Sequence, residues 1–586
     1  MNFKRILYKA FSHKTLSVRA CVFRIVSILF VWLIIVLPVS FASDIVDNIA
    51  ESDLPAEIIV NEMQRHLVLD DYQNWAPGLN WKKLRQFYAK RGFLPVWLNL
   101  NGPTDRARIV RDVLLEADKE GLDPTEYHGP ALQYLWRAKR DRSKARLELL
   151  LTDALLRYGL EVSAGYRNPR AADIDWYVKP KRINIIKRLE RVLTSSDVGL
   201  VLRNFSPPHP AYDKLKEKLA HYRQLAEKGP WQKVAYAPQL QLGMSHSVIP
   251  SIRKRLQQEM YLQAGPMGVT HGDISRSAED DVSNNKTSDY FDAELDEAVR
   301  KFQLYYGHKV DGVVGYFTRQ SLNVGVEAQI ARIKQNMERW RWMPRDLGRR
   351  YIMVNMAGYE LNLIDDGASV MEMPVIIGKT FRATPAFMDN LEYVELNPTW
   401  KVPPRIAKEK FLPKLRQDPE FLRINNLKVF DSWRKNAKEV DPETIDWWEV
   451  SDKRFPYKLE QTPGAHNSMG RIKFMFPNRF RVYLHDTPDR TLFDRHVRTF
   501  SSGCIRLAEP YKLANKVLSW GDEQTSFDVK RQILTGETLQ IGLKKKLPVY
   551  LMYWTAWVDK EGQIHFRNDI YQRNERIATG KKVGVS

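Results

Sequence analysis

The pattern of apolar positions divides the chain into a helical part and a later part with strands. Between residues 43 and 240, apolar side chains recur at helical spacing, as in Trp81–Ala89 and Leu147–Leu160. One more helix is predicted over Ile330–Trp342, and after it apolar and polar residues alternate as in β-strands. The alternating segments are Tyr351–Met356, Tyr359–Ile364, Ser369–Ile377, Leu391–Leu396, Arg471–Phe476 and Phe480–His485, with a final hairpin over Pro548–Trp557 and Ile564–Arg567. The pattern predicts a multidomain α+β protein.

Changes in this pattern give the domain boundaries, and a length of 586 residues suits about four domains. We expect a leader at 1–42, an α-helical scaffold at 43–240, a central helical module at 243–325, a connecting helix at 326–346, a β-rich domain at 350–575 and a tail at 576–586. The central module carries a Ser-, Asn-, Asp- and Gly-rich flexible insertion at 265–292. A charged, mostly helical segment at 403–461 interrupts the β-rich domain, and we interpret it as a lid.

The first 42 residues have the layout of an export signal. A basic flank without acidic residues precedes the apolar run Ile25–Leu37, and the small residues Ser40 and Ala42 mark a cleavage site. The run is shorter than the roughly 20 residues of a membrane-spanning helix. We expect a periplasmic protein with a cleaved signal, and an uncleaved signal anchor in the inner membrane is the alternative.

Composition and charge narrow the class further. With 44% hydrophobic and 27% charged residues, the chain is not mainly disordered. Lys and Arg number 91 against 70 Asp and Glu, a net charge of +21, which in an exported protein favours anionic wall polymers or membrane surfaces over nucleic acid. Two cysteines, Cys21 and Cys504, exclude a disulfide framework. Once the leader is removed, Cys504 is the last thiol: a buried small residue, a partner for an intermolecular bridge or a nucleophile.

The sequence around Cys504 favours nucleophilic chemistry. A predicted strand ends at His485, and Cys504 follows in a Ser-Gly turn just before a predicted helix. An imidazole or a helix N-terminus lowers the pKa of a nearby thiol, and Gly503 allows close backbone approach, so that the amides of Gly503 and Cys504 could hold an oxyanion. Metal binding by the set His466, His485, Asp486 and His496 is conceivable, but its spacing matches no known zinc motif. We therefore predict no metal and no cofactor.

Two stretches resemble known families. The central module, through Ala298–Gln303, Asp311-Gly312, Gly315 and Thr318, resembles the three-helix peptidoglycan-binding domain of cell-wall enzymes. The run His485-Asp-Thr, followed by Ser501-Ser-Gly-Cys504-Ile-Arg506, resembles the His-x-x…Ser-x-Gly-Cys-x-Arg signature of L,D-transpeptidases with a YkuD-type (ErfK/YbiS) catalytic domain. Three flanking stretches agree: Asn397–Pro403, Pro463–Gly470 and Lys473–Asn478. The order of modules is similar to that of the large, lid-bearing periplasmic members of this family.

The resemblance implies a β-sandwich catalytic domain and a defined reaction. Cys504 would attack the third residue, a meso-diaminopimelate, of a donor tetrapeptide stem, releasing D-Ala and forming a thioester. A diaminopimelate amine of an acceptor stem would resolve it into a 3→3 cross-link. His485 would move the protons, with a backbone carbonyl near Asp486 or Thr487 orienting its ring. The backbone amides of Tyr483, Gly503 and Cys504 would stabilise the oxyanion.

Several further residues and functions stay open at this point. Trp400, Ser501, Ser502 and Arg506 are candidate substrate contacts, each with a structural alternative in the core or in the turn. Water as acceptor would make an L,D-carboxypeptidase or endopeptidase, and a protein amine would attach a protein to the wall. A non-enzymatic wall-binding scaffold is the other class. The resemblance also implies a carbapenem target with a role in cell shape, and as partners the peptide stems, glycan strands bound by the central module and other cell-wall synthases.

Overall fold

The computed structural model describes residues 57–68, 79–263, 289–418, 420–451, 453, 455–520 and 528–579. The predicted leader at 1–42 and residues 265–288 of the predicted insertion lie outside these ranges. The contacts divide the chain into two units, one of Met1–Arg111 and His128–Asp153, the other of Asp112–Tyr127 and Ala154–Ser586. Within the described ranges, no helix has the length and apolarity needed to cross a membrane.

The first unit is helical, as its sequence predicts. Its elements are α3 (Glu57–Val68), α5 (Trp81–Ala89), the short pair β1 (Leu98–Asn99) and β2 (Gly102–Pro103), α7 (Gly129–Leu135), and the first parts of α6 (Asp105–Leu115) and α8 (Asp141–Ala164). Glu148 of α8 is fully buried and accepts hydrogen bonds from the Tyr88 hydroxyl (2.7 Å) and the Trp97 amide (3.0 Å). A buried carboxylate needs such donors to offset its lost hydration, so Glu148 ties α8 to α5 and to the segment before β1.

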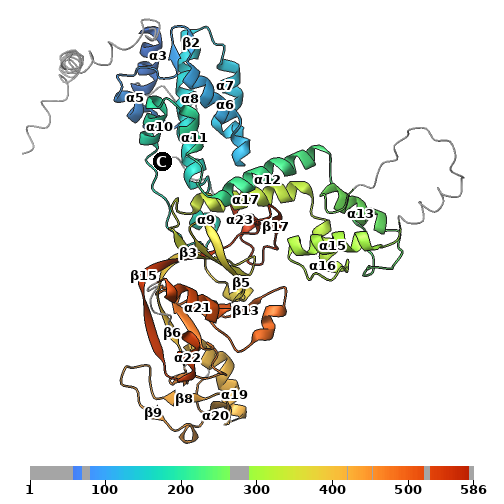
Figure 1. Ribbon diagram of the computed structural model, residues 1–586. Helices are drawn as coiled ribbons and strands as arrows, with labels where there is room; N and C mark the ends of the chain where they lie inside the picture. Colours follow the sequence, from blue (N-terminus) through green and yellow to red (C-terminus); the bar gives the residue numbers. More distant parts are fainter. Residues whose placement is uncertain are drawn as a thin grey trace, which may run out of the picture. The chain divides into compact units, whose positions relative to one another are not determined.

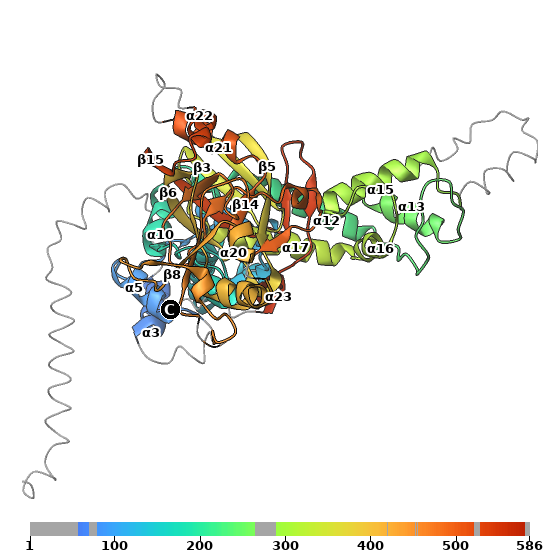
Figure 2. The same ribbon diagram turned by 90° about the horizontal axis from the view of Figure 1, so that it is seen from below.

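The second unit begins with helices. These are η3 (Ala117–Glu120), η4 (Pro124–Tyr127), α9 (Pro169–Ala172), α10 (Ile185–Thr194), α11 (Val198–Arg203), α12 (Pro210–Glu227), α13 (Ile249–Gln258), α15 (Ala293–Tyr306), α16 (Tyr316–Leu322) and α17 (Val326–Trp342). Helices α12 and α17 lie side by side, and α13, α15 and α16 form a group of three (Figures 1 and 2). The predicted flexible insertion does not extend over 289–292, because Phe291 is fully buried and Asp292 caps α15 through the Leu295 amide (2.9 Å).

A sheet of nine strands follows. Its order is β13-β5-β14-β12-β11-β6-β15-β3-β4, and β5 also pairs with β4, so that the sheet folds back on itself around an apolar interior. The strands are β3 (Arg350–Asn355), β4 (Glu360–Asp365), β5 (Ala368–Gly378), β6 (Phe387–Leu396), β11 (Ile472–Met475), β12 (Leu484–His485), β13 (Thr499–Ser501), β14 (Ile505–Leu507) and β15 (Leu539–Met552). Smaller elements complete this part: η5 (Thr380–Arg382), η8 (Arg490–Asp494), α21 (Pro510–Ser519), α22 (Val529–Leu534) and α23 (Asn574–Thr579).

Two predicted strands are wrong in extent. Residues 480–483 do not continue β12, because the Asn478 side chain binds the amides of Phe480 and Val482 and Arg481 has a positive φ of 56°. Pro548–Met552 belongs to β15, which pairs with β6 and β3. The final hairpin is instead β16 (Ala556–Val558) with β17 (Ile564–Phe566).

The segment at 403–461 contains more than the predicted helices. After α18 (Pro404–Ile406), a π-helical turn (Ala407–Phe411), α19 (Leu412–Gln417) and α20 (Phe421–Ile424), it forms the strands β8 (Leu427–Phe430), β9 (Glu439–Val440) and β10 (Lys458–Gln461), with the 3₁₀ turn η7 (Pro442–Thr444) between β9 and β10. Together with β7 (Trp400–Lys401), these strands make a second sheet in the order β7-β10-β8-β9. The segment has its own small core, including Leu412, Leu422 and Trp447, so it is a subdomain.

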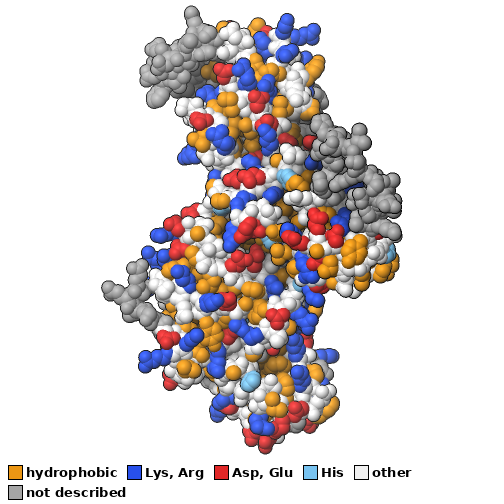
Figure 3. Space-filling view, turned by 45° about the vertical axis from the view of Figure 1, so that its right-hand side comes forward, with side chains coloured by type: hydrophobic (Ala, Val, Ile, Leu, Met, Phe, Trp, Pro, Cys, Tyr) orange, Lys and Arg blue, Asp and Glu red, His pale blue; other side chains and the backbone are white. Residues whose placement is uncertain are grey.

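On the face drawn in Figure 3, Lys and Arg side chains are mixed with Asp and Glu. A nucleic-acid-binding surface is expected to carry a basic patch or stripe. The positive net charge is not gathered into such a stripe on this face. The sheet, the helices and the order of modules confirm the multidomain α+β class predicted from the sequence.

Candidate active site

Two neighbouring strands bring His485 and Cys504 together. β12 and β14 are parallel, with Leu484 opposite Ile505 and His485 opposite Arg506. His485 is therefore the last residue of one strand, and Cys504 immediately precedes the other. The Ile505 amide donates to the Tyr483 carbonyl (3.1 Å), which extends the pairing toward the thiol.

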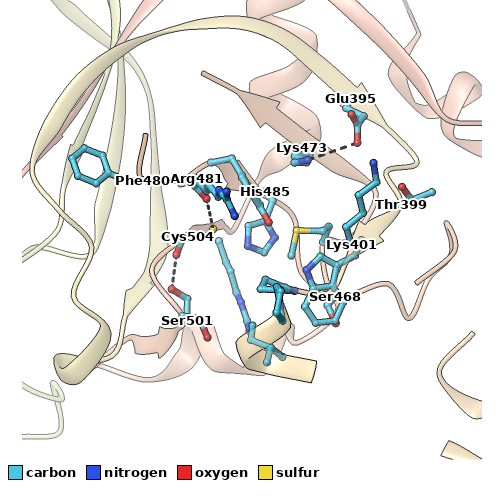
Figure 4. A pocket seen from close by; sticks show the side chains of 18 of the residues that line it. Glu395, Thr399, Lys401, Ser468, Lys473, Phe480, Arg481, His485, Ser501 and Cys504 are labelled. Carbon is cyan, nitrogen blue, oxygen red and sulfur yellow. Dashed lines mark hydrogen bonds and ion pairs between the residues drawn. The ribbon is translucent and has the colours of Figure 1, made fainter. Parts of the chain in front are cut away.

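Both side chains line a cavity of about 840 Å³ (Figure 4). The other predicted residues whose side chains lie on its wall are Trp400, Tyr483, Ser501, Ser502 and Arg506. The structure thus brings together residues that are about a hundred positions apart in the sequence. Six positions on the wall come from the inserted subdomain: Pro403, Pro404, Ile406, Lys410, Phe411 and Trp433.

The imidazole of His485 is held in one tautomer. Its Nδ1 lies 2.5 Å from the Asp486 carbonyl oxygen, and a carbonyl can only accept, so Nδ1 carries the proton and Nε2 keeps its lone pair. Burial lowers the pKa of His485 to about 3, and the positive charges of Arg506 and Lys473 act in the same direction. The ring is therefore neutral at physiological pH and able to accept a proton.

The thiol of Cys504 is also kept neutral in the resting state. Burial raises its pKa, whereas the backbone amide and hydroxyl of Tyr483 and the charges of Lys473 and Arg506 oppose that rise. The Tyr483 amide therefore points toward the sulfur. A donor in this position also suits the oxyanion that forms when the sulfur attacks a carbonyl.

The turn before Cys504 corrects one expectation. Gly503 has a φ of +122°, which L side chains rarely adopt, so this turn needs glycine. Its amide donates to the Ser501 hydroxyl (3.0 Å), and that hydroxyl donates to the Cys504 carbonyl (2.5 Å). The Gly503 amide is thus used within the turn and does not face the cavity as an oxyanion donor. Ser501 is 3% exposed and holds the turn.

The other candidate contacts have mixed surroundings. Trp400 is buried against Phe411 in the core of the subdomain and also lines the cavity. It is therefore a core residue that is also placed to contact a substrate. Arg506 pairs with Asp489 (3.3 Å) while facing the cavity. Ser502 is exposed and accepts from Arg382 (3.2 Å).

Comparison with known proteins shows what this arrangement belongs to. Residues 349–541 match the family model of the L,D-transpeptidase catalytic domain, called YkuD. The chain carries an L,D-transpeptidase catalytic domain. The resemblance of the His485 and Cys504 segments is thereby confirmed at the level of the family.

Two other family models flank this L,D-transpeptidase domain. Residues 82–219 match a scaffold domain, and residues 251–322 match a family described as "Putative peptidoglycan binding domain". The helical N-terminal region and the three-helix module of the prediction correspond to these two matches.

One curated protein and two solved structures are also similar to parts of this chain. A curated protein of Haemophilus influenzae named "Putative L,D-transpeptidase" is 36% identical over 230 residues, which cover 39% of this chain and 45% of that protein. Two solved structures are similar at 12% identity and a TM-score of 0.17: an L,D-transpeptidase of Xylanimonas cellulosilytica, covering 54% of this chain and 99% of its own, and the avibactam carbamoyl enzyme of Ldtfm, covering 58% and 98%.

Sequence reasoning missed several residues of the candidate site. Lys473 lies opposite both His485 and Glu395 in the sheet, and it pairs with Glu395 at 3.9 Å. The carbonyl of Arg481 lies 3.8 Å from the Cys504 sulfur. A lysine between the buried residues Ile472 and Phe474 was a detectable signal, since the alternate face of that strand had to be polar. Within the described ranges, no group of three or more His, Cys, Asp or Glu residues is arranged to hold a metal ion.

Proposed function

We propose that this protein is a peptidoglycan L,D-transpeptidase that forms 3→3 cross-links through a thioester on Cys504. The observation that carries the proposal is that the Cys504 thiol and the neutral His485 imidazole line the same cavity, in a domain that matches the L,D-transpeptidase catalytic family. The match to the curated relative covers only 45% of that protein. The activity proposed for the whole chain is therefore argued from this site and not from the relative.

In the first half-reaction, Nε2 of His485 takes the thiol proton and the sulfur attacks the carbonyl of the third residue of a donor stem. The negative charge on that oxygen is stabilised by the amides of Tyr483 and Cys504. The C–N bond then breaks, His485 returns the proton to the departing amine, and D-Ala leaves. Cys504 is left as a thioester.

In the second half-reaction, the side-chain amine of an acceptor stem attacks the thioester. His485 accepts a proton from this amine, a new amide bond forms between two diaminopimelate residues, and the thiolate departs. The proton on His485 then restores the thiol. Neither half needs a third acidic side chain, because the Asp486 carbonyl orients the imidazole.

The charge of the cavity supports a peptide with carboxylates as substrate. Its lining includes five cations and one acid: Lys401, Lys410, Lys473, Arg481, Arg506 and Glu395. Burial lowers the pKa of Lys410, and the neighbouring cations Lys379, Arg382, Arg506 and Lys414 act in the same direction, so this part of the wall has a positive potential. Stem peptides bring the missing negative charge.

The deciding experiment is incubation of the purified protein with disaccharide tetrapeptide, followed by mass spectrometry. Dimeric product, released D-Ala and a protein adduct of thioester mass are expected, and Cys504→Ala should abolish all three. A tripeptide product alone would indicate an L,D-carboxypeptidase. Cross-linking that persists in Cys504→Ala would refute the mechanism.

We further propose that the protein works in the periplasm and that its central module holds glycan strands. The proposal rests on the leader pattern at 1–42 and on the family match at 251–322. Intact mass after expression in an exporting host should show loss of residues 1–42. Pull-down of the purified protein with insoluble peptidoglycan tests the second part.

A further inference from the structure

A chain of hydrogen bonds supports the carbonyl of Gly503 in the turn Ser501–Cys504, which we call the nucleophile turn. The hydroxyl of Thr384 donates to this carbonyl at 2.8 Å and accepts from the Gly378 amide at 3.0 Å. Thr384 is fully buried, so water does not compete for these bonds. The backbones of Gly378 and Gly503 run close together, since a Cβ placed on Gly378 would lie 3.1 Å from the Gly503 Cα.

The same loop is held from the other side by the C-terminal part of the chain. The Tyr571 hydroxyl donates to the Gly378 carbonyl at 2.6 Å, and Arg573 donates to the Thr384 carbonyl at 2.9 Å. Tyr571 is itself fixed, because its amide donates to the Tyr553 hydroxyl (3.1 Å) and the two rings stack. These residues follow residue 541, where the catalytic family match ends.

We infer that Thr384 and Tyr571 are positioning residues that set the direction of the Cys504 amide. This inference rests on the proposed acyl transfer. In a trans peptide unit the C=O and the following N–H point in opposite directions. When Thr384 draws the Gly503 carbonyl away from the cavity, the Cys504 N–H is turned toward it. There it joins the Tyr483 amide as the second oxyanion donor, a role that the Gly503 amide cannot fill because it binds Ser501.

The arrangement separates two properties of Cys504. The reactivity of the thiol depends on His485, Tyr483 and nearby charges, none of which bonds to Thr384 or Tyr571 in the hydrogen bonds described above. Stabilisation of an acyl oxyanion depends on the orientation of the Gly503–Cys504 peptide. Loss of the support should therefore slow acylation and leave simple alkylation of the thiol intact, because alkylation forms no oxyanion.

The test compares Thr384→Val, Thr384→Ser and Tyr571→Phe in the full chain. Each variant is assayed for alkylation by iodoacetamide and for acylation by a carbapenem and by disaccharide tetrapeptide. Thr384→Val should lose about 10²–10³-fold in acylation with little change in KM, the cost of one misdirected oxyanion donor. Thr384→Ser should recover most of it, and Tyr571→Phe should show a smaller loss. The rate of alkylation in each variant should stay within about twofold of the wild-type rate, because alkylation does not use an oxyanion donor.

Tyr550→Phe is the matched control, since the Tyr550 hydroxyl also donates to a buried carbonyl, that of Leu347 (3.1 Å), away from the turn. Equal acylation in all variants would refute the inference, and so would a parallel loss of alkylation. If Thr384→Val does not fold, the acylation rates of Tyr571→Phe and Tyr550→Phe are compared. A loss in Tyr571→Phe alone supports the inference, and equal rates refute it. A wild-type protein that is alkylated but takes neither acyl donor would instead refute the proposed function.

Discussion

At the scale of single residues, the Cys504 thiol and the His485 imidazole are both neutral in the resting state. Burial raises the pKa of Cys504 and lowers that of His485 to about 3. A preformed thiolate–imidazolium pair would need the opposite shifts. The proton must therefore move when substrate is bound, and the cost of ionising the thiol in the resting enzyme limits side reactions.

These directions predict the pH dependence of alkylation. The rate with iodoacetamide should rise about tenfold per pH unit from pH 6 to above pH 9, because the thiolate fraction grows until pH passes the raised pKa of Cys504. No step is expected near pH 6.5, because His485 stays neutral down to about pH 3. Stopped-flow alkylation over this range checks both points. A plateau below pH 7 would contradict them.

Lys473 should tune both groups in the same direction. Its charge lowers the pKa of His485 and that of Cys504, so Lys473→Met should raise both. The rate of alkylation at pH 8 should then fall by about threefold, which corresponds to a rise of about half a unit in the pKa of the thiol. Lys546→Met is the control, since Lys546 pairs with Glu392 on an exposed part of the sheet. An unchanged rate in Lys473→Met would show that its charge does not reach the sulfur.

At the scale of elements, the inserted subdomain forms one wall of the cavity and is joined to the nucleophile turn. Arg382 donates to Ser502 and pairs with Glu409 in the π-helical turn, and Glu409 also pairs with Arg405. π-Helical turns are rare and are frequent at functional sites. Arg382 is therefore the link through which a movement of the subdomain would reach the turn.

Glu409→Gln should loosen this link. Hydrogen exchange in residues 404–417 should rise about twofold to tenfold, because the substitution removes two ion pairs. If the subdomain excludes water as a lid, the hydrolysed share of product should also rise. Glu420→Gln, which removes the exposed Arg423 pair in the same subdomain, should change neither. No difference between the two variants would show that the link does not hold the subdomain.

The elements also show what sequence reasoning can reach. The strands β3, β4 and β5 follow from alternation alone, and the signature around Cys504 predicted two residues, His485 and Cys504, that the structure places on one cavity. The second sheet was missed because β9 has two residues and β8 lies among charged side chains, so neither has a clear period. The roles of Thr384 and Tyr571 depend on bonds between residues 119 and 193 positions from their partners, and no local pattern encodes such distances.

At the scale of the whole molecule, a buried polar network holds the helices of the second unit together. Glu338 of α17 is fully buried and accepts from the Arg167 amide (2.8 Å), the Trp342 indole (3.1 Å) and the Arg341 guanidinium (2.9 Å). Arg341 is itself fully buried and in contact with the Tyr212 hydroxyl (2.9 Å). The polar groups of this network bind one another. Removing one side chain therefore leaves a charged partner buried in the core without its hydrogen bond.

Glu338→Ala should therefore lower the free energy of unfolding by about 3–5 kcal/mol, the cost of breaking a buried ion pair. Glu297→Ala, which removes an exposed pair with Lys301, should cost less than about 1 kcal/mol. Thermal and urea unfolding measure both. The rate of Cys504 alkylation in the folded fraction should be unchanged, and a small loss of stability in Glu338→Ala would contradict the role assigned to this network.

The support of the nucleophile turn by Tyr571 has a consequence for how the molecule matures. A chain emerging from the ribosome presents Cys504 before the second half of β15 and Tyr571 have followed. Until they do, the hydrogen bond from Tyr571 that supports the orientation of the Cys504 amide is absent. Under the proposed acyl transfer, acylation of Cys504 should therefore be slow until the C-terminal part of the chain has folded. By the same logic, removal of the chain from Tyr571 onward should slow the proposed acylation of Cys504 without changing any residue that lines the cavity.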